Sequence, residues 1–203
     1  MRKFIRDDRG IAAVEFAILA IPLFMLIMGS LEFGLKMYYK ARAEGVLRDA
    51  ARMSVTGDTT RIGEKGELID AYVEKELKFS SSAEVDIDKV FYDEFSQVRQ
   101  PEKRLSNATS APYCFIDTNG NQTWDADPSQ TGIGGADDII DYRVVVTYDA
   151  YFPLVTNVIT GEKKMTVSAQ TTVRNEPFAG NNDQQPQTCC VSAAAGNPVT
   201  CEG

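Results

Sequence analysis

An apolar segment near the N-terminus restricts the fold of this chain more than any other feature of its sequence. Residues 11–31 contain a single charge, Glu15. A helix rises about 1.5 Å per residue, so this segment is long enough to cross the ~30 Å hydrocarbon core of a bilayer. The basic residues at the start of the chain come directly before it: Arg2, Lys3, Arg6 and Arg9. By the positive-inside rule, we expect a single-pass protein with a cytoplasmic N-terminus and an extracytoplasmic remainder.

Two plainer interpretations of this segment are a cleavable signal and a permanent anchor. A cleavable secretory signal would use the small-residue pattern Ala41-Arg42-Ala43. That pattern lies well beyond the apolar segment, and the apolar part of such signals is only about 7–15 residues long. An ordinary membrane anchor that is never cleaved remains open at this point.

The apolar segment is expected to continue as one long helix. Apolar residues recur at steps of three or four after it and form a single stripe, which Gly57-Asp58 would end. The stripe consists of Leu35, Tyr39, Ala43, Val46, Ala50 and Met53. We therefore predict a helix that lies half in the membrane and half against a soluble head.

The remaining pattern predicts a small α+β head with an antiparallel sheet. Residues 64–79 read as a second helix with Leu68, Tyr72, Val73 and Leu77 on its apolar face. Three segments are typical of strands because they alternate or are rich in β-branched and aromatic residues. These strands are 85–91, 139–154 and 164–174, with residues 157–163 as the connection between the last two. Residues 96–112 and the polar tail from Gly180 onward are expected to be irregular.

Composition argues against two classes of function. The formal net charge is -8, which disfavours nucleic acid as a partner because phosphate binding needs clustered Lys and Arg. The chain has no histidine, the commonest general base and transition-metal ligand. Asp137, Asp138 and Asp141 could pair for acid–base work, but they read more simply as a solvated run before a strand. We expect no enzymatic activity.

Four cysteines predict disulfide bonds. They are Cys114, Cys189, Cys190 and Cys201, and three of them lie close together in the tail. An even number of cysteines beyond a membrane span indicates an oxidising compartment such as the periplasm. Four cysteines allow three pairings, and the sequence does not choose among them.

One loop is a candidate calcium site. Asp117, Asn119, Asn121 and Asp125 place oxygen atoms at alternate positions, which suits a hard cation. The match to an EF-hand loop is incomplete, because its glycine stands at the fourth position and Pro128 at the twelfth. The alternative is a solvated turn whose Asp and Asn side chains bond their own backbone, with Trp124 as a packing anchor. No cofactor other than this candidate calcium is expected.

The start of the apolar segment carries a specific pattern. Gly10 directly precedes it, and Glu15 is the fifth residue after that glycine. A carboxylate within a membrane span is costly unless it is paired, which makes Glu15 a functional candidate. The run from Arg9 to Glu15 resembles the prepilin peptidase site of type IV pilin-like proteins. The resemblance implies cleavage between Gly10 and Ile11, and pairing of Glu15 with the new Ile11 amine of a neighbouring subunit.

Further motifs extend the resemblance over about the first 55 residues. They are the run Ala12-Ala13-Val14-Glu15-Phe16-Ala17, then Pro22, the run Gly29-Ser30-Leu31-Glu32-Phe33-Gly34, and Ala50-Ala51-Arg52. In combination they resemble the TadE-like family of tight-adherence (Tad/Flp) pilus proteins. The resemblance implies assembly roles for Glu15, Phe16 and Glu32. For Glu32 it supplies no mechanism, and the plainer interpretation is an interfacial carboxylate at the end of the span.

The resemblance implies a minor pilin, or pseudopilin, needed for biogenesis of a tight-adherence pilus and for surface attachment. Its partners would be the bacterial inner membrane, other pilus subunits, the assembly platform and the prepilin peptidase. The alternative is an uncleaved, membrane-anchored periplasmic binding or adhesin domain. The expected organisation is a leader at 1–10, a transmembrane helix at 11–33, a helix extension at 34–57, a periplasmic head at 58–178 and a tail at 179–203.

Overall fold

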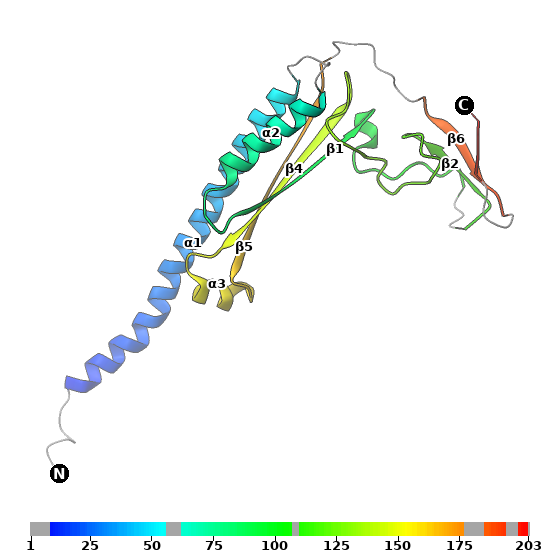
Figure 1. The fold of residues 1–203 in the computed structure, drawn as a ribbon. Helices are drawn as coiled ribbons and strands as arrows, with labels where there is room; N and C mark the ends of the chain where they lie inside the picture. Colours follow the sequence, from blue (N-terminus) through cyan, green and yellow to red (C-terminus); the bar gives the residue numbers. More distant parts are fainter. Residues whose placement is uncertain (1–8, 56–61, 107–109, 177–184, 194–198, 203) are drawn as a thin grey trace.

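A computed structural model describes residues 9–55, 62–106, 110–176, 185–193 and 199–202. It begins with helix α1 (Arg9–Val55), which is 47 residues long and contains Pro22. The N-terminal half of α1 projects away from the rest of the chain, and its C-terminal half lies along a sheet (Figure 1). The predicted architecture, a long apolar helix followed by an antiparallel-sheet head, is confirmed. The predicted leader and the boundaries at 57–58 and 178–179 fall largely outside the described residues.

The main sheet has four antiparallel strands in the order β3-β1-β4-β5. They are β1 (Glu84–Tyr92), β3 (Gln130–Thr131), β4 (Ile139–Asp149) and β5 (Lys164–Arg174). Val144 at the middle of β4 faces Ile87 of β1 on one side and Ala169 of β5 on the other. Strand β5 alternates buried and exposed residues from Lys164 to Gln170, which turns one face of the sheet toward α1.

The predicted apolar stripe of α1 packs on this sheet. Tyr39, Ala43, Val46 and Ala50 are all buried, and Leu47 is buried beside them. Small residues at two of these positions let the helix axis approach the strands closely. Met53, the last residue of the predicted stripe, is instead 41% exposed, because the buried face of the last turn consists of Ala50, Ala51 and Ser54.

Helix α2 (Ile62–Leu77) packs beside α1 with a slightly different face from the predicted one. Val73 and Leu77 are fully buried as expected, and the third buried residue of the row is Ile69. Leu68 is 69% exposed, so its assignment to the apolar face was wrong. The buried row is spaced by four residues, which places Leu68 about 100° around the helix from it.

The connection between β4 and β5 is a helix and not the predicted continuation of the strand. Strand β4 ends at Asp149, and α3 (Pro153–Thr160) follows it. Two local signals explain α3. Pro153 stands at its first position, where a missing N–H does no harm, and Gly161 ends it in a left-handed conformation (φ 77°) that glycine adopts without strain.

A second, smaller sheet was not predicted. It contains β2 (Tyr113–Asp117), β6 (Gln187–Val191) and β7 (Val199–Glu202) in the order β2-β6-β7, so part of the tail is ordered. It lies beyond β1, away from α1 (Figure 1). A short 3₁₀ helix, Phe95–Gln97, overlaps the start of the segment 96–112 that was expected to be irregular.

Two disulfides cross-link the strands of this small sheet, which confirms the expectation of disulfide bonds. Cys114 pairs with Cys190 across β2 and β6, and Cys189 pairs with Cys201 across β6 and β7. The buried core of this sheet is small, with Phe115, Cys189 and Val191 at its centre. A core of this size needs covalent support to hold its register.

Candidate functional site

The N-terminal half of α1 is a bare apolar surface. Side chains from Ala13 to Leu19 are exposed, and Phe16 is 69% exposed. Within the part of the chain that the structure describes, α1 is the one helix that is long and apolar enough to cross a membrane. Most of this half of α1 is therefore available to contact lipid or other chains.

Glu15 lies on this bare surface. Its side chain is exposed and has no hydrogen-bond or ion-pair partner among the described residues. Gly10 and Ile11 lie in the first turn of α1, and their side chains are outside the described residues. Since an ionised carboxylate is costly in hydrocarbon, a partner for Glu15 in a membrane or fibre has to come from outside the head. The assembly role of Glu15 and Phe16 stays a prediction.

Glu32 is different, because it is only 4% exposed and joins α1 to α3. Its Oε2 accepts a hydrogen bond from the backbone N–H of Phe152, 2.9 Å away. Phe152 is the residue that precedes the first turn of α3, where free N–H groups favour a negative charge. The structure therefore gives Glu32 a specific contact, which the sequence pattern had left without a mechanism.

An aromatic cluster continues from Glu32 along α1. Tyr39 stacks on Phe79 with ring centroids 3.7 Å apart, and its hydroxyl lies 2.7 Å from that of Tyr151. Burial, and then the hydrogen bond to Tyr151, raise the pKa of Tyr39 to about 12. Burial, and then the negative charge of Glu32, raise the pKa of Tyr148 to about 12. The cluster fixes the head to α1 just beyond the apolar segment.

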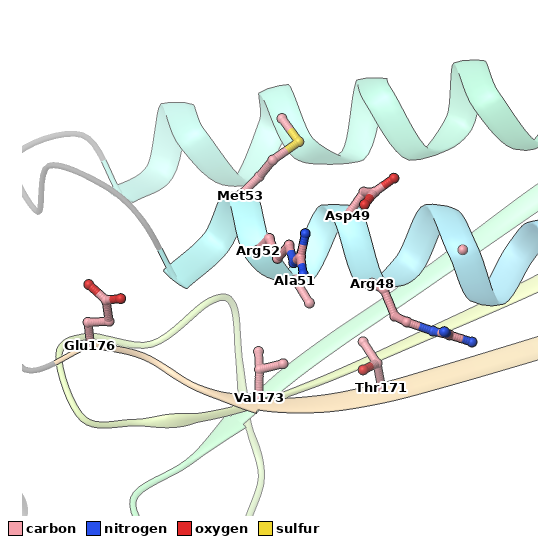
Figure 2. A pocket seen from close by; sticks show the side chains of 9 residues that line it. Arg48, Asp49, Ala51, Arg52, Met53, Thr171, Val173 and Glu176 are labelled. Atoms are coloured by element: carbon pink, nitrogen blue, oxygen red, sulfur yellow. The ribbon is translucent and has the colours of Figure 1, made fainter.

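The Ala50-Ala51-Arg52 motif lies where α1 leaves the sheet. Ala50 and Ala51 are buried, whereas Arg52 is exposed beside an open groove of about 880 Å³. Figure 2 shows the last turns of α1 above β5, with the groove between them. Its lining combines apolar and oppositely charged side chains: Gly45, Arg48, Asp49, Ala51, Arg52, Met53, Thr171, Val173 and Glu176. We assign no ligand to this groove.

The candidate calcium loop is held together by its own hydrogen bonds. Asp117 is buried, and its two carboxylate oxygens accept backbone N–H bonds from Gly120 and Gln122 at 2.8 Å each. The side-chain amides of Asn119 and Asn121 both donate to Asp125, at 2.9 and 2.6 Å. The structure thus brings the four predicted residues together in one turn, with their donors and acceptors paired to each other. Calcium binding stays a prediction.

A buried glutamate that the sequence did not single out organises this loop. Glu102 is 5% exposed, and its carboxylate accepts bonds from the backbone N–H groups of Thr118 and Asp125, 2.8 and 3.0 Å away. Its backbone carbonyl accepts a bond from the indole of Trp124. The guanidinium of Arg104 lies 3.9 Å from the centre of the same ring. Trp124 is therefore a packing anchor for the loop.

Asp137 and Asp138 directly precede β4, Asp141 lies within it, and the three have separate partners. Asp141 is 2% exposed and pairs with Arg99 at 2.7 Å. Asp138 accepts a bond from the backbone N–H of Gly135, and Asp137 pairs with Arg174 at 3.2 Å. Asp141 and Asp138 are buried, so the interpretation as a fully solvated run was wrong for these two. Buried carboxylates of this kind are supported by charged or N–H donors.

The fold and these contacts define a class of protein: an α+β head fixed to one apolar helix of the kind that anchors proteins in membranes. The comparisons with known proteins identify its N-terminal segment. Residues 10–52 match the model of the TadE-like protein family, which confirms the resemblance and includes Gly10, Glu15 and Glu32. The match implies an association with pilus machinery in general. No curated protein and no solved structure matches the chain.

Proposed function

We propose that this protein is a minor pilin, or pseudopilin, of a tight-adherence pilus, and that its role is structural and not enzymatic. It would be needed for biogenesis of the pilus and hence for surface attachment. The observation that carries the proposal is the position of Glu15. It lies on the bare apolar half of α1 without a partner among the described residues, inside the segment that matches the TadE-like family.

Maturation would begin with hydrolysis of the peptide bond between Gly10 and Ile11 by a prepilin peptidase. Water adds across this bond, so that Gly10 leaves with a carboxylate and Ile11 gains a free amine. Glu15 of one subunit then pairs with the Ile11 amine of its neighbour as the helices stack. An ion pair in such surroundings sets register more than it adds net stability. Exposed Phe16 beside it supplies apolar contact in the stack.

In this proposal the protein resides in the bacterial inner membrane before assembly, with its N-terminus in the cytoplasm and its head in the periplasm. The basic residues before α1 support this orientation. The disulfides of the second sheet suit the oxidising periplasm. Other pilus subunits and the assembly platform would then be its partners.

The proposal is tested by changing Glu15 in the full chain in its own host. Glu15→Ala and Glu15→Gln should leave the membrane level of the protein intact, since both make α1 less polar, but should abolish or strongly reduce pili and attachment. Val14→Ala is the matched control, because Val14 is exposed on the same turn and carries no charge. Normal pili in the Glu15 variants would contradict the proposed mechanism.

A further inference from the structure

Helix α3 presents an apolar face that no other described residue of the chain covers. It contains no charged residue, and Leu154 is 83% exposed, Val158 67% and Ile159 70%. Leaving each such side chain in water forgoes the favourable free energy of burying its apolar surface. A two-residue turn could join two antiparallel strands without exposing these side chains. An exposed apolar helix at this point therefore indicates that something outside the head contacts it.

The position of α3 shows which surface it extends. A Cβ on Gly29 of α1 would lie 3.6 Å from Val155 and 3.7 Å from Ile159, so α3 packs on α1 at this level. The bond between Glu32 and Phe152 holds the start of α3 about one turn further along. Gly29 lies within the apolar segment and Glu32 directly follows it. Helix α3 thus lies beside the end of the segment that is able to span a membrane (Figure 1).

The surface of α1 at the same level is also apolar. Leu31 is 53% exposed and Phe33 is 61% exposed. The apolar face of α3 and the exposed apolar side chains at the end of the span therefore lie at the same level along the α1 axis. Their shared level favours one medium or partner in contact with both surfaces.

Several polar groups of α3 are hydrogen-bonded within the described part of the chain, which suits a medium poor in water; the exposed side-chain amide of Asn157 is not among them. The backbone N–H groups of Val155 and Thr156 both bond the Phe152 carbonyl, and the Gly161 N–H bonds the Asn157 carbonyl. The hydroxyls of the helix do the same, since Thr156 donates to the Phe152 carbonyl and Thr160 to the Thr156 carbonyl. The Glu32 carboxylate accepts the hydrogen bond of the Phe152 N–H, and Pro153 has no backbone N–H to satisfy.

Lysine side chains lie near α3 and beyond the end of the apolar segment of α1. Lys163 and Lys164 follow α3 and are exposed, with Glu162 beside them as the opposing charge. Lys36 and Lys40 lie on α1 about one and a half and two and a half turns beyond the apolar segment. Lysines at such a boundary are attracted to anionic headgroups. Phospholipid therefore fits this surface better than the apolar helix of a neighbouring chain.

We infer that α3 is an interfacial membrane helix, which inserts Leu154, Val158 and Ile159 at the headgroup–acyl boundary of the leaflet that faces the head. Helix α1 crosses the bilayer, and α3 lies on it and fixes the height and tilt of the head. The inference goes beyond the proposed pilin role. It depends only on α1 spanning a bilayer and holds whether or not the leader is removed.

Depth-dependent quenching tests this inference on the full-length protein. A single added cysteine, Val158→Cys, is labelled with a nitrobenzoxadiazole probe after reconstitution into phosphatidylethanolamine–phosphatidylglycerol vesicles. Among the described residues no cysteine is free, so the added thiol is the one that reacts. Thr166→Cys is the matched control, because Thr166 is an exposed residue of β5 only a few residues from α3.

We expect lipids with a nitroxide near the headgroup to quench the probe at 158 severalfold more than the probe at 166, at every protein-to-lipid ratio. Adding Leu154→Asp should abolish that difference while the near-ultraviolet circular dichroism of the head stays unchanged. Equal quenching at the two positions would overturn the inference. So would quenching that persists with Leu154→Asp, or a protected probe that appears only at high protein density, which would indicate a second copy of the chain.

Discussion

The carboxylate of Glu32 accepts a hydrogen bond from the backbone N–H of Phe152, a residue 120 positions later in the chain. This bond fixes the β4–β5 connection to the end of the apolar half of α1. The second oxygen of Glu32, Oε1, is buried and has no hydrogen-bond partner in the described part of the chain. The hydrogen bond of Glu32 and the neighbouring aromatic cluster around Tyr39 therefore fix the position of the head along α1.

Replacing Glu32 should loosen the head from α1. Glu32→Ala leaves the part-buried Phe152 N–H without its acceptor and should destabilise the head by about 1–3 kcal/mol, whereas Glu32→Gln keeps an acceptor and should cost less. Hydrogen exchange of the Phe152 amide in detergent micelles measures this directly. Glu44→Ala is the control, because Glu44 pairs with Arg48 only at the surface, 3.7 Å apart. Unchanged protection of Phe152 in Glu32→Ala would show that the bond is not needed.

Reduction of the disulfides should unfold the second sheet and leave the main sheet intact. The closed loops span 76 and 12 residues, which corresponds to about 4.5 and about 3 kcal/mol of chain entropy. Hydrogen exchange before and after treatment with a reductant separates the two sheets. Retention of protected amides in β6 after full reduction would contradict the expectation. Cys201→Ser removes only the disulfide that closes the shorter loop, so it measures the contribution of that loop alone.

Loss of the Glu102 carboxylate should disturb the loop from Asp117 to Asp125. Its charge-assisted bonds to Thr118 and Asp125 hold that loop, so Glu102→Ala should cost about 2–3 kcal/mol locally. Trp124 is the single tryptophan of the chain, and its emission should shift to the red. Glu162→Ala, which removes an exposed carboxylate, should leave the emission unchanged. A Glu102→Ala spectrum identical to that of the unmodified chain would show that Glu102 does not order the loop.

The buried tyrosines should make the head sensitive to alkaline pH. Burial raises the pKa of Tyr39, Tyr92 and Tyr148 to about 12 each, from an ordinary value of 10.0. Since each folded pKa lies above the unfolded one, this stabilisation is complete below pH 10 and is lost as the pH rises from about 10 to 12. Absorbance of tyrosinate should show a late-titrating group in the folded protein. Titration of all eight tyrosines together near pH 10 would argue against it.

Long periodic segments were predictable from the sequence because their physics is local. The apolar stripe of α1 and the alternation of β5 each repeat often enough to define a buried face. Short elements were less predictable. The strand pattern toward Leu154 concealed α3, although Pro153 and Gly161 are the ordinary start and end signals of a helix.

The second sheet could not be predicted from the sequence. Its strands are four or five residues long, and β2 finds its partner β6 about 70 residues later. Its register follows from the disulfide pairing, which a count of cysteines leaves open. Glu102 was overlooked for a related reason, because a glutamate is rarely buried and only the folded loop supplies its donors. Glu32 was found through the family pattern, but its partner Phe152 is visible only in the fold.

The central claim is that α1 becomes an assembly helix once the chain is cut after Gly10. Mass spectrometry of the N-terminus tests it most directly, on protein purified from cells with an active prepilin peptidase and from cells that lack the enzyme. The account predicts that the chain begins at Ile11 in the first case and retains its basic leader in the second. A chain that begins at Met1 in both would contradict it.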